Sequence, residues 1–313
     1  MDFIDLFAGI GGFHLAAKKH GHTCVFASEI DKFARQTYAV NHGMMPHGDI
    51  KTIASEDIPA HDILFAGFPC PAFSKAGISS RAHYGYKTGL KDTEHGGTMF
   101  YQILRIADYH KPEYLILENV ANLITHDKGR TFKIIQRELE AIGYSVQWRE
   151  VDGLLCVPQR RKRVFMVCTR TQPYLFPLFQ LSRHVLFTDI LEDTTDYTIS
   201  DKWWNALKAH RTRHSLKGNG FGYVIIPPVE NAIAPTLTKS YGSGNNGLIY
   251  QPYRNPRMYT PRECARLMGY PDSFKIPVSR TQAYKQFGNS IIVPIAETII
   301  KEIDKWRIQN LET

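Results

Sequence analysis

The sequence pattern best suited to covalent chemistry is the Pro-Cys-Pro turn at residues 69–71, which follows the apolar run DILFAGF. A proline on each side of Cys70 restricts two φ angles, so the thiol is held in place. A thiol held at the end of a strand suits nucleophilic catalysis, provided that a positive or dipolar neighbour favours the thiolate. The alternative is a buried structural thiol, because most free cysteines are small hydrophobic residues.

Two further segments carry charged groups that can assist such a thiol. Glu118 lies in YLILENV, where a carboxyl group can hold or donate a proton at a ring nitrogen of a bound heterocycle. The run PQRRKRVF places Arg161 and Arg163 at alternating positions, which predicts that both lie on one face of a strand. Arginines there can lower the pKa of the thiol, hold the acid or bind phosphate, and each can equally be a surface charge.

A glycine-rich turn indicates a ligand of the adenosyl type. FIDLFAGIGGF places Gly9, Gly11 and Gly12 after an expected strand, where glycine permits a tight turn and close approach of the backbone to a ligand. His14 breaks the dinucleotide-binding fingerprint. Glu29 ends the next expected strand and can accept the two ribose hydroxyls. These residues leave a nicotinamide cofactor and S-adenosylmethionine both open.

Alternation of short apolar runs with helical periods predicts the fold that must position these groups. Helical spacing occurs from Phe100 to Ala107 and from Phe132 to Ile142. Strands are expected at Phe3–Phe7, Cys24–Glu29, Ile63–Phe68, Tyr114–Glu118, Val146–Val151 and Val164–Thr169. This order is typical of an α/β protein with a doubly wound, mostly parallel, Rossmann-like sheet.

The second half of the chain predicts a smaller, irregular domain. Residues 173–258 are rich in Gly, Pro, Asn, Tyr and basic residues, and the final segment again carries an apolar stripe, from Ile292 to Trp306, that needs the sheet to cover it. We therefore expect a discontinuous catalytic domain at 1–175 and 286–313. Residues 176–258 would form the second domain, and 259–285 a hinge or brace that is mostly structural.

Charge and cysteine content narrow the class of protein. The net charge of +8 favours polyanion partners, and Lys202, Lys208, Arg211, Arg213 and Lys217 follow one another without an intervening acid. That segment is either a solvated helix face or a phosphate-contacting surface. Five cysteines without a C-x-x-C pair argue against disulfides and metal sites. No signal peptide or membrane span is evident, so a cytoplasmic protein is expected.

The set of motifs resembles the DNA (cytosine-5) methyltransferases of the bacterial restriction–modification type. DLFAGIGG, GFPCPAFS, ENV, QRRKR, RECARLMGYPDSF and QFGNSI are similar to six motifs of that family and occur in the family's order. Each match is weak by itself, but the ordered set makes chance similarity very improbable. The segment between QRRKR and RECAR corresponds to the variable target-recognition region of the family.

The resemblance implies a mechanism. Cys70 would attack carbon 6 of a cytosine that has left the duplex, and Glu118 would interact with ring nitrogen 3. Arg161 and Arg163 would support the base and the acid. Carbon 5 would then take a methyl group from S-adenosylmethionine, after which the carbon 5 proton and Cys70 would leave.

The resemblance also implies binding residues and partners. Residues implied for the cofactor are Phe7, Gly9, Ile10, Gly11, Glu29, Ile30, Asp49, Ile50, Gly67, Pro69, Met99, Asn289 and Ser290. Residues implied for double-stranded DNA are Ser74, Lys75, Gln159, Thr236, Tyr241 and Gly242. The expected protein is a monomer that protects host DNA, with a cognate restriction endonuclease as a functional rather than physical partner.

Two departures from the family pattern concern DNA handling. Pro71 stands where the family usually has Gln, so a side-chain amide and a backbone donor are missing beside the emptied site. Gly96 stands where an Arg is usual. The loop from Ser74 to Gly97 is long and carries several cations, and we expect it to close over the flipped base.

The sequence disfavours four other functions. A tRNA cytosine methyltransferase of the same fold usually carries Cys-Phe-Thr, which is absent here. A catalytically impaired DNA-binding or regulatory protein has only Pro71 in its favour. His14 argues against a nicotinamide oxidoreductase, and the Phe-Pro-Cys sequence at 68–70 disfavours methylation of an exocyclic nitrogen.

Overall fold

The computed structural model describes residues 1–69, 99–171, 174, 176, 185–216, 218, 222–242 and 247–311. It divides the chain into two compact units. The first comprises Met1–Asp152, Lys162–Phe179 and Val293–Thr313, and the second comprises Gly153–Arg161 and Gln180–Ile292. By this division residues 259–292 belong to the second unit. The predicted functions of the domains remain predictions. Cys70 and the loop from Ser74 to Gly97 lie outside the described residues.

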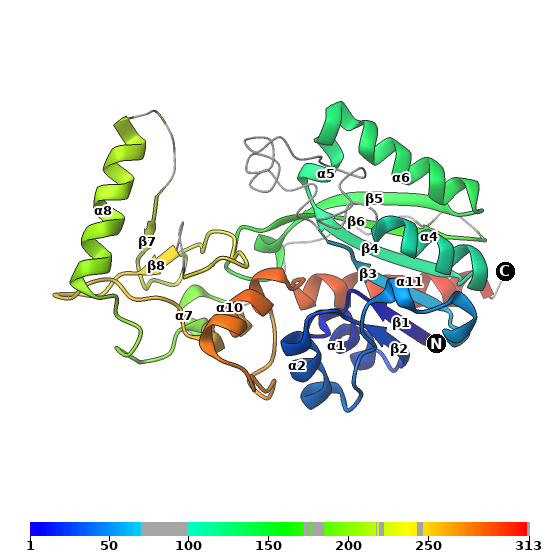
Figure 1. Cartoon of the computed structure of the whole chain (residues 1–313), viewed down its shortest axis with the longest axis horizontal. Coiled ribbons are helices and arrows are strands. Elements are labelled where there is room, and N and C mark those ends of the chain that lie inside the picture. Colours follow the sequence, from blue (N-terminus) through cyan, green and yellow to red (C-terminus); the bar gives the residue numbers. More distant parts are fainter. Residues whose placement is uncertain are drawn as a thin grey trace. The chain divides into compact units, whose positions relative to one another are not determined.

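The first unit is built on a six-stranded sheet (Figure 1). Its strands, in sequence order, are β1 Asp2–Leu6, β2 Thr23–Ser28, β3 Ile63–Gly67, β4 Tyr114–Val120, β5 Ser145–Asp152 and β6 Lys162–Thr169. The spatial order is β2-β1-β3-β4-β6-β5, and only β6 runs against the others. The predicted doubly wound, mostly parallel sheet is confirmed, because the apolar runs form buried strands near the predicted positions.

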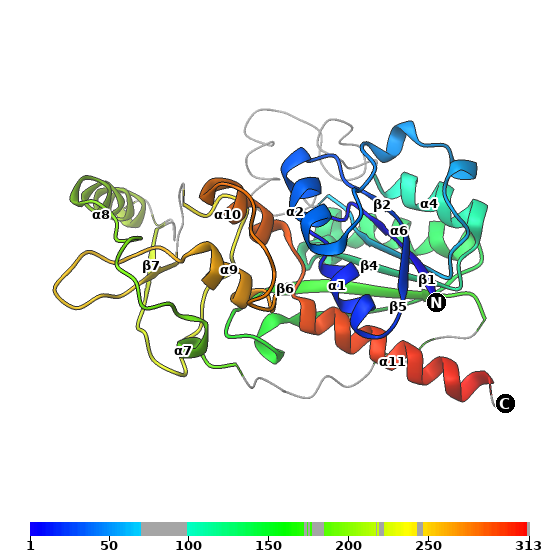
Figure 2. The ribbon, with the colours of Figure 1, turned by 90° about the horizontal axis from the view of Figure 1, so that it is seen from below.

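Helices cover both faces of this sheet (Figure 2). Side chains on one face of the strands, such as Leu64 and Leu117, form a core with Ile103 and Ile135. On the other face the rings of Phe13 and Phe65 stack at 5.0 Å. The helices of the first unit are α1 Gly12–Lys19, α2 Lys32–His42, α4 Met99–His110, α5 Asn122–Thr125, α6 Arg130–Ala141 and α11 Val293–Leu311.

The last helix returns to the sheet, as its apolar stripe predicted. In α11, Ile295, Ile299 and Ile303 are almost wholly buried, and the Trp306 ring lies 6.2 Å from that of Tyr114 on β4. Short 3-10 helices complete the unit at Ile50–Thr52, Ser55–Asp57 and His126–Gly129. Among the described residues, no helix combines the length and the apolar character that crossing a bilayer requires.

The second unit contains little regular sheet. A two-stranded parallel sheet pairs β7 Val224–Ile226 with β8 Gly247–Ile249. Its helices are α7 Phe187–Ile190, α8 Asp201–Leu216, α9 Pro261–Leu267 and α10 Arg280–Asn289, with a 3-10 helix at Gly153–Leu155. The sequence predicted an irregular domain here and offered a solvated helix face as one interpretation of the basic segment. That segment forms the sixteen-residue α8.

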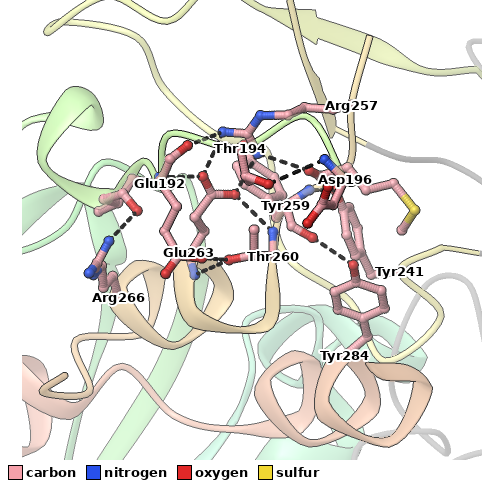
Figure 3. Close-up of polar contacts among 12 residues, drawn as sticks. Glu192, Thr194, Asp196, Tyr241, Arg257, Tyr259, Thr260, Glu263, Arg266 and Tyr284 are labelled. Carbon is pink, nitrogen blue, oxygen red and sulfur yellow. Dashed lines mark hydrogen bonds and ion pairs between the residues drawn. The ribbon is translucent and has the colours of Figure 1, made fainter. Parts of the chain in front are cut away.

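A buried ion pair organises the start of α9 (Figure 3). Arg257 donates from two guanidinium nitrogens to Glu263, at 2.7 and 2.8 Å, and the two side chains are 5% and 0% exposed. Glu263 also accepts from the backbone N–H of Thr260, while the Thr260 hydroxyl accepts from the N–H of Glu263. This capping box satisfies donors that the first turn leaves free, so RECARL begins as a helix.

The turn after β1 repeatedly adopts left-handed backbone conformations. Phe7, Gly9 and Gly11 have φ angles of 56°, 57° and 82°. The His42 ring packs against this turn, and its Nε2 lies 3.1 Å from the carbonyl oxygen of Ile10. His42 also stacks on His14, with ring centroids 4.1 Å apart. Gly11 is therefore favoured both by the conformation and by the packing, and Gly9 by the conformation alone.

Gly11→Ala should destabilise the protein more than Gly43→Ala. Both glycines have a left-handed φ, of 82° and 76°, so each substitution carries a backbone cost of about 1–2 kcal/mol. A Cβ on Gly11 would lie 2.2 Å from Nε2 of His42, whereas a Cβ on Gly43 meets nothing within 4 Å. We expect urea unfolding to show an additional loss of about 1–3 kcal/mol for Gly11→Ala. Equal losses would contradict the proposed packing.

His42→Gln should make the protein less sensitive to acid. Burial lowers the pKa of His42 from 6.5 to about 4, so between these values the unfolded chain binds a proton that the folded one does not. Stability is therefore fully present above pH 6.5 and falls as the pH falls, by up to about 1.4 kcal/mol per pH unit for this group. Urea unfolding at pH 6 and at pH 5 should therefore show a smaller fall in the free energy of unfolding for the variant than for the wild type.

His61→Gln should likewise reduce the loss of stability in acid, because burial lowers the pKa of His61 from 6.5 to about 4. Asp5 and Glu29 act in the opposite direction, since burial raises the pKa of both carboxyl groups. They are common to the wild type and both variants, so the difference in slope isolates each histidine. Slopes equal to that of the wild type would show that these rings titrate normally in the folded protein.

Candidate active site

The carboxyl ends of four parallel strands bring together most of the predicted site residues of the first unit. The register pairs Leu6 of β1 with Ser28 of β2 and Ala66 of β3, and it pairs Gly67 with Glu118 of β4. The glycine turn, Glu29, Pro69 and Glu118 therefore follow neighbouring strands at one edge of the sheet. Ligands bind at this edge in doubly wound folds.

Glu29 is tied to the glycine turn. Its Oε2 accepts from the backbone N–H of Gly9 at 2.8 Å, and its Oε1 accepts from that of Asp31 at 2.8 Å. Burial raises the pKa of the Glu29 carboxyl group above its ordinary value, although the two N–H donors favour the charged form. Each carboxylate oxygen can accept a further hydrogen bond, so Glu29 retains the capacity to bind two hydroxyl groups.

The remaining predicted cofactor residues of this unit vary in exposure. Ile30 is 70% exposed beside Glu29, whereas Ile50 is 2% exposed. Asp49 caps the 3-10 helix that follows it, accepting from the N–H of Lys51. Met99 is half-buried at the start of α4. An exposed apolar side chain next to a carboxylate is a suitable surface for an adenosyl group.

Glu118 and Arg163 form an ion pair. Nε of Arg163 lies 3.0 Å from Oε1 of Glu118, and the two side chains are 15% and 11% exposed. The pair arises because β4 and β6 are antiparallel, with Glu118 opposite Phe165 and Val120 opposite Arg163. A carboxylate held in this way is oriented and shielded from bulk water, as a group acting on a bound base requires.

Asn119, which directly follows Glu118 in YLILENV, is a further residue of this site. It is 1% exposed, and its Nδ2 donates to the carbonyl oxygen of Phe68 at 3.1 Å. Phe68 directly precedes Pro69 at the end of β3, so this bond fixes the backbone leading to Cys70. The signal in the sequence was an amide next to Glu118 in a strand whose remaining residues are apolar or aromatic, where a polar side chain needs a partner.

Arg161 has a different environment from Arg163. It belongs to the second unit, is 2% exposed, and donates to the carbonyl oxygens of Leu237, Gly288 and Ser290 at 2.7–3.1 Å. β6 begins at Lys162, so Arg161 directly precedes the strand, and its partners differ from those of Arg163. Arg161 therefore joins three backbone segments of its own unit.

The residues predicted to contact DNA occupy contrasting positions in the second unit. Gln159 is fully buried, donating to the Leu267 carbonyl and accepting from the N–H of Leu237. Tyr241 is 7% exposed, and its hydroxyl donates to the Gly247 carbonyl while accepting from the N–H of Tyr259.

Thr236 and Gly242 complete this group. Thr236 is exposed and donates to the Arg160 carbonyl. Gly242 is half-buried, with a φ of 94°. Of the four residues, Thr236 is the one whose side chain lies on the surface.

Two predicted cofactor residues also belong to the second unit. Asn289 is exposed at the end of α10, and the Ser290 hydroxyl lies 2.7 Å from that of Tyr270. The QFGNSI motif also contains Gly288. A Cβ at this position would lie 2.3 Å from backbone atoms of Thr238, which explains why the residue is glycine. Cys70, Ser74 and Lys75 lie outside the described residues.

Together these groups can bind a nucleoside-like ligand at Glu29 and the glycine turn, and orient a carboxylate two strands away. Comparison with known proteins places this geometry in a family. Residues 1–305 match the family model described as C-5 cytosine-specific DNA methylase.

Curated relatives extend over nearly the whole chain. The type II methyltransferase M.DsaV of Dactylococcopsis salina is 40% identical over 310 residues, covering 97% of this chain and 86% of the relative. The type II methyltransferase M.NlaX of Neisseria lactamica is 43% identical over 309 residues, covering 96% and 95%.

Solved structures agree on the fold. The Dnmt2 methyltransferase of S. pombe superposes with a TM-score of 0.77 at 21% identity, over 98% of this chain and 99% of the other. The match to the family model and the identity to its members carry the assignment further than fold alone: this chain belongs to the C-5 cytosine-specific DNA methylases and is a DNA (cytosine-5-)-methyltransferase.

Proposed function

We propose that the chain methylates carbon 5 of a cytosine extruded from a specific duplex sequence, through a covalent adduct with Cys70. The observation that carries this mechanism is the ion pair between Glu118 and Arg163, at the strand end next to the one that leads to Cys70. Family membership implies S-adenosylmethionine as the methyl donor. The role in host protection is proposed from the type II names of the relatives.

The position of Cys70 in the sequence supports its role as the nucleophile. It follows Phe68 and Pro69, whose backbone is held by the hydrogen bond from Asn119. Burial raises the pKa of Cys24 to about 12 and also raises those of Cys168 and Cys264, so these three thiols are poor sources of thiolate.

The chemical steps follow from the reactivity of the pyrimidine ring. Bond formation between the Cys70 sulfur and carbon 6 pushes negative charge onto ring nitrogen 3, where Glu118 would hold a proton. Carbon 5 then becomes nucleophilic. The cofactor, when bound, supplies a methyl group on a positively charged sulfur. Loss of the carbon 5 proton and expulsion of the thiolate restore the aromatic ring.

Residues around the glycine turn would bind the cofactor. Glu29 has acceptor capacity for two ribose hydroxyls, and its bond to Gly9 holds it against the turn. Ile30 offers an exposed apolar surface for the adenine. The other members of the proposed set in the first unit are Phe7, Ile10, Gly11, Asp49, Ile50, Gly67, Pro69 and Met99. Asn289 and Ser290 remain proposed members from the second unit.

The duplex itself must open for this chemistry. A stacked cytosine does not present its face to a thiol, so the base has to rotate out of the helix. We propose that Ser74, Lys75 and Thr236 contact the DNA around the emptied site. For Gln159 and Tyr241 the buried contacts described above favour positioning of the DNA-binding segments over direct contact with a base, whereas Gly242 remains a proposed DNA contact. The chain would act as a monomer, with any cognate endonuclease as a separate protein.

Cys70→Ala should abolish methyl transfer while leaving cofactor affinity nearly unchanged. The substitution removes the sulfur that activates carbon 5 but no group proposed to bind the cofactor. Transfer of labelled methyl from S-adenosylmethionine to DNA from an unmodified host measures activity, and calorimetry measures cofactor affinity. Cys156→Ala is the matched control and should retain activity. Methylation by Cys70→Ala at a comparable rate would refute the covalent scheme.

Sequencing the methylated DNA identifies the target sequence, after which an oligonucleotide with 5-fluorocytosine at the target position tests the adduct. Fluorine at carbon 5 cannot leave as a proton does, so the complex should be trapped. Mass analysis should find the label on Cys70. An unmodified protein, or a label on another residue, would exclude the proposed step.

Arg163→Ala should lower the rate of methyl transfer by about 10- to 100-fold, because a hydrogen bond to a charged group contributes about 1.5–3 kcal/mol. Lys162→Ala is the control on the same strand: it removes an exposed ion pair with Glu150 instead of the buried one with Glu118. Single-turnover rates with saturating DNA and cofactor measure both variants. Equal rates for the two would remove Arg163 from the proposed machinery.

A further inference from the structure

Helix α8 of the second unit is unusual because the chain covers so little of it. None of its sixteen residues is buried. Four side chains, at 203, 204, 207 and 214, are half-buried, and the other twelve are exposed. Most helices in folded proteins depend on a packed face for their stability, and isolated helices of this length are marginal in water. An open helix of this kind has a surface available for a partner.

The outward face of α8 has a regular composition. At intervals of four, three and four residues, one exposed row consists of Lys202, Ala206, Ala209 and Arg213. Residues so spaced lie above one another on a helix. A cation therefore stands near each end of the row with two small side chains between them, an arrangement that allows the helix backbone to approach a flat or grooved surface closely.

Charge on the helix is almost entirely positive. Lys208 and Arg211 add to the two cations of the row, and they lie over the rings of Trp204 and Tyr223 at 5.5 and 4.9 Å. Asp201 is the helix's one acidic residue, and it lies in the first turn, where a negative charge stabilises the helix dipole. It accepts from Nδ2 of Asn255 at 2.6 Å.

A surface hollow of about 560 Å³ lies at the end of the helix where Asp201 stands. It is lined by Asp201, Tyr250, Gln251, Tyr253, Arg254 and Asn255. Arg254 and Tyr253 are exposed. An arginine and aromatic rings beside a row of cations match the chemistry of a nucleic acid backbone and its bases.

We propose that the outward face of α8 binds phosphates of duplex DNA, in addition to the contacts made by the residues of the predicted site. The helix is roughly 24 Å long, which corresponds to about seven base pairs of duplex. Contacts of this kind carry no sequence information; they add affinity and orient the enzyme. This inference rests on the proposed function, since it takes duplex DNA to be the substrate.

The test measures, by fluorescence anisotropy, how binding to a random-sequence duplex of 30 base pairs depends on the salt concentration. Each phosphate contact contributes about 0.9 to the slope of log affinity against log salt concentration. The double variant Lys202→Gln, Arg213→Gln should therefore have a slope smaller by roughly 2. Glutamine keeps the helix propensity close to that of lysine and arginine, so α8 should still form, which circular dichroism checks.

The matched control removes the same charge from the other unit. Lys301→Gln and Lys305→Gln neutralise two exposed cations of α11 and should leave the slope unchanged. Hydrogen exchange gives a second measurement: backbone amides of α8 should exchange more slowly when the wild type is saturated with the duplex. Equal slopes for the α8 and α11 variants, or α8 amides that the duplex does not protect, would overturn the proposal.

Two further outcomes separate the proposal from its alternatives. If sedimentation showed a wild-type dimer that the α8 variant dissociates, with the DNA slope unchanged, the face would bind a second copy of this chain and the proposal would fail. If the wild type bound the duplex without salt dependence and transferred no methyl group to DNA, the proposed function itself would fail. Loss of the slope difference alone, with methylation intact, would overturn only the role of α8.

Discussion

The structure of the first unit depends on a backbone that turns sharply where β1 ends. Phe7, Gly9 and Gly11 all have left-handed φ angles, and Glu29 accepts a hydrogen bond from the N–H of Gly9. A left-handed conformation is costly for a phenylalanine, so surrounding contacts must hold it, here in part the apolar core against which Phe7 packs. The turn therefore has the Glu29 carboxylate on one side and the His42 ring on the other. These contacts hold the turn in place within the protein itself.

Buried charge is handled differently at three positions, and each suits its surroundings. Glu118 and Arg163 pair near the edge of the sheet, where both remain partly accessible to a ligand. Arg257 and Glu263 pair in the interior of the second unit, where their contacts are wholly structural (Figure 3). Arg161 has carbonyl oxygens as partners, so its charge joins backbone segments without using a carboxylate. Each arrangement gives the guanidinium group hydrogen-bond acceptors, as burial of a charge requires.

The two units also differ in how completely they cover their own elements. In the first, helices enclose both faces of the sheet, and Ile295, Ile299 and Ile303 of α11 are buried. In the second, α8 has no buried residue, although irregular segments elsewhere in that unit are well packed around Tyr241 and Tyr259. A helix that its own chain leaves open, with cations at 202 and 213 and alanines between them, fits an enzyme whose substrate is a large polyanion.

The sequence alone determined the six strands of the sheet, their order along the chain and the family. Apolar periods of two and 3.6 residues depend on local geometry, and six short motifs kept their order along the chain. The tertiary structure decided which side chains and backbone groups pair with one another. Glu118 meets Arg163 because β6 runs antiparallel to β4, and Arg161, two residues earlier, bonds to carbonyls of Leu237 and Ser290. Strand register likewise places the Asn119 side chain against the carbonyl oxygen of Phe68, the residue before Pro69. Such pairings join residues distant in sequence, and no local pattern encodes which donor will face which acceptor.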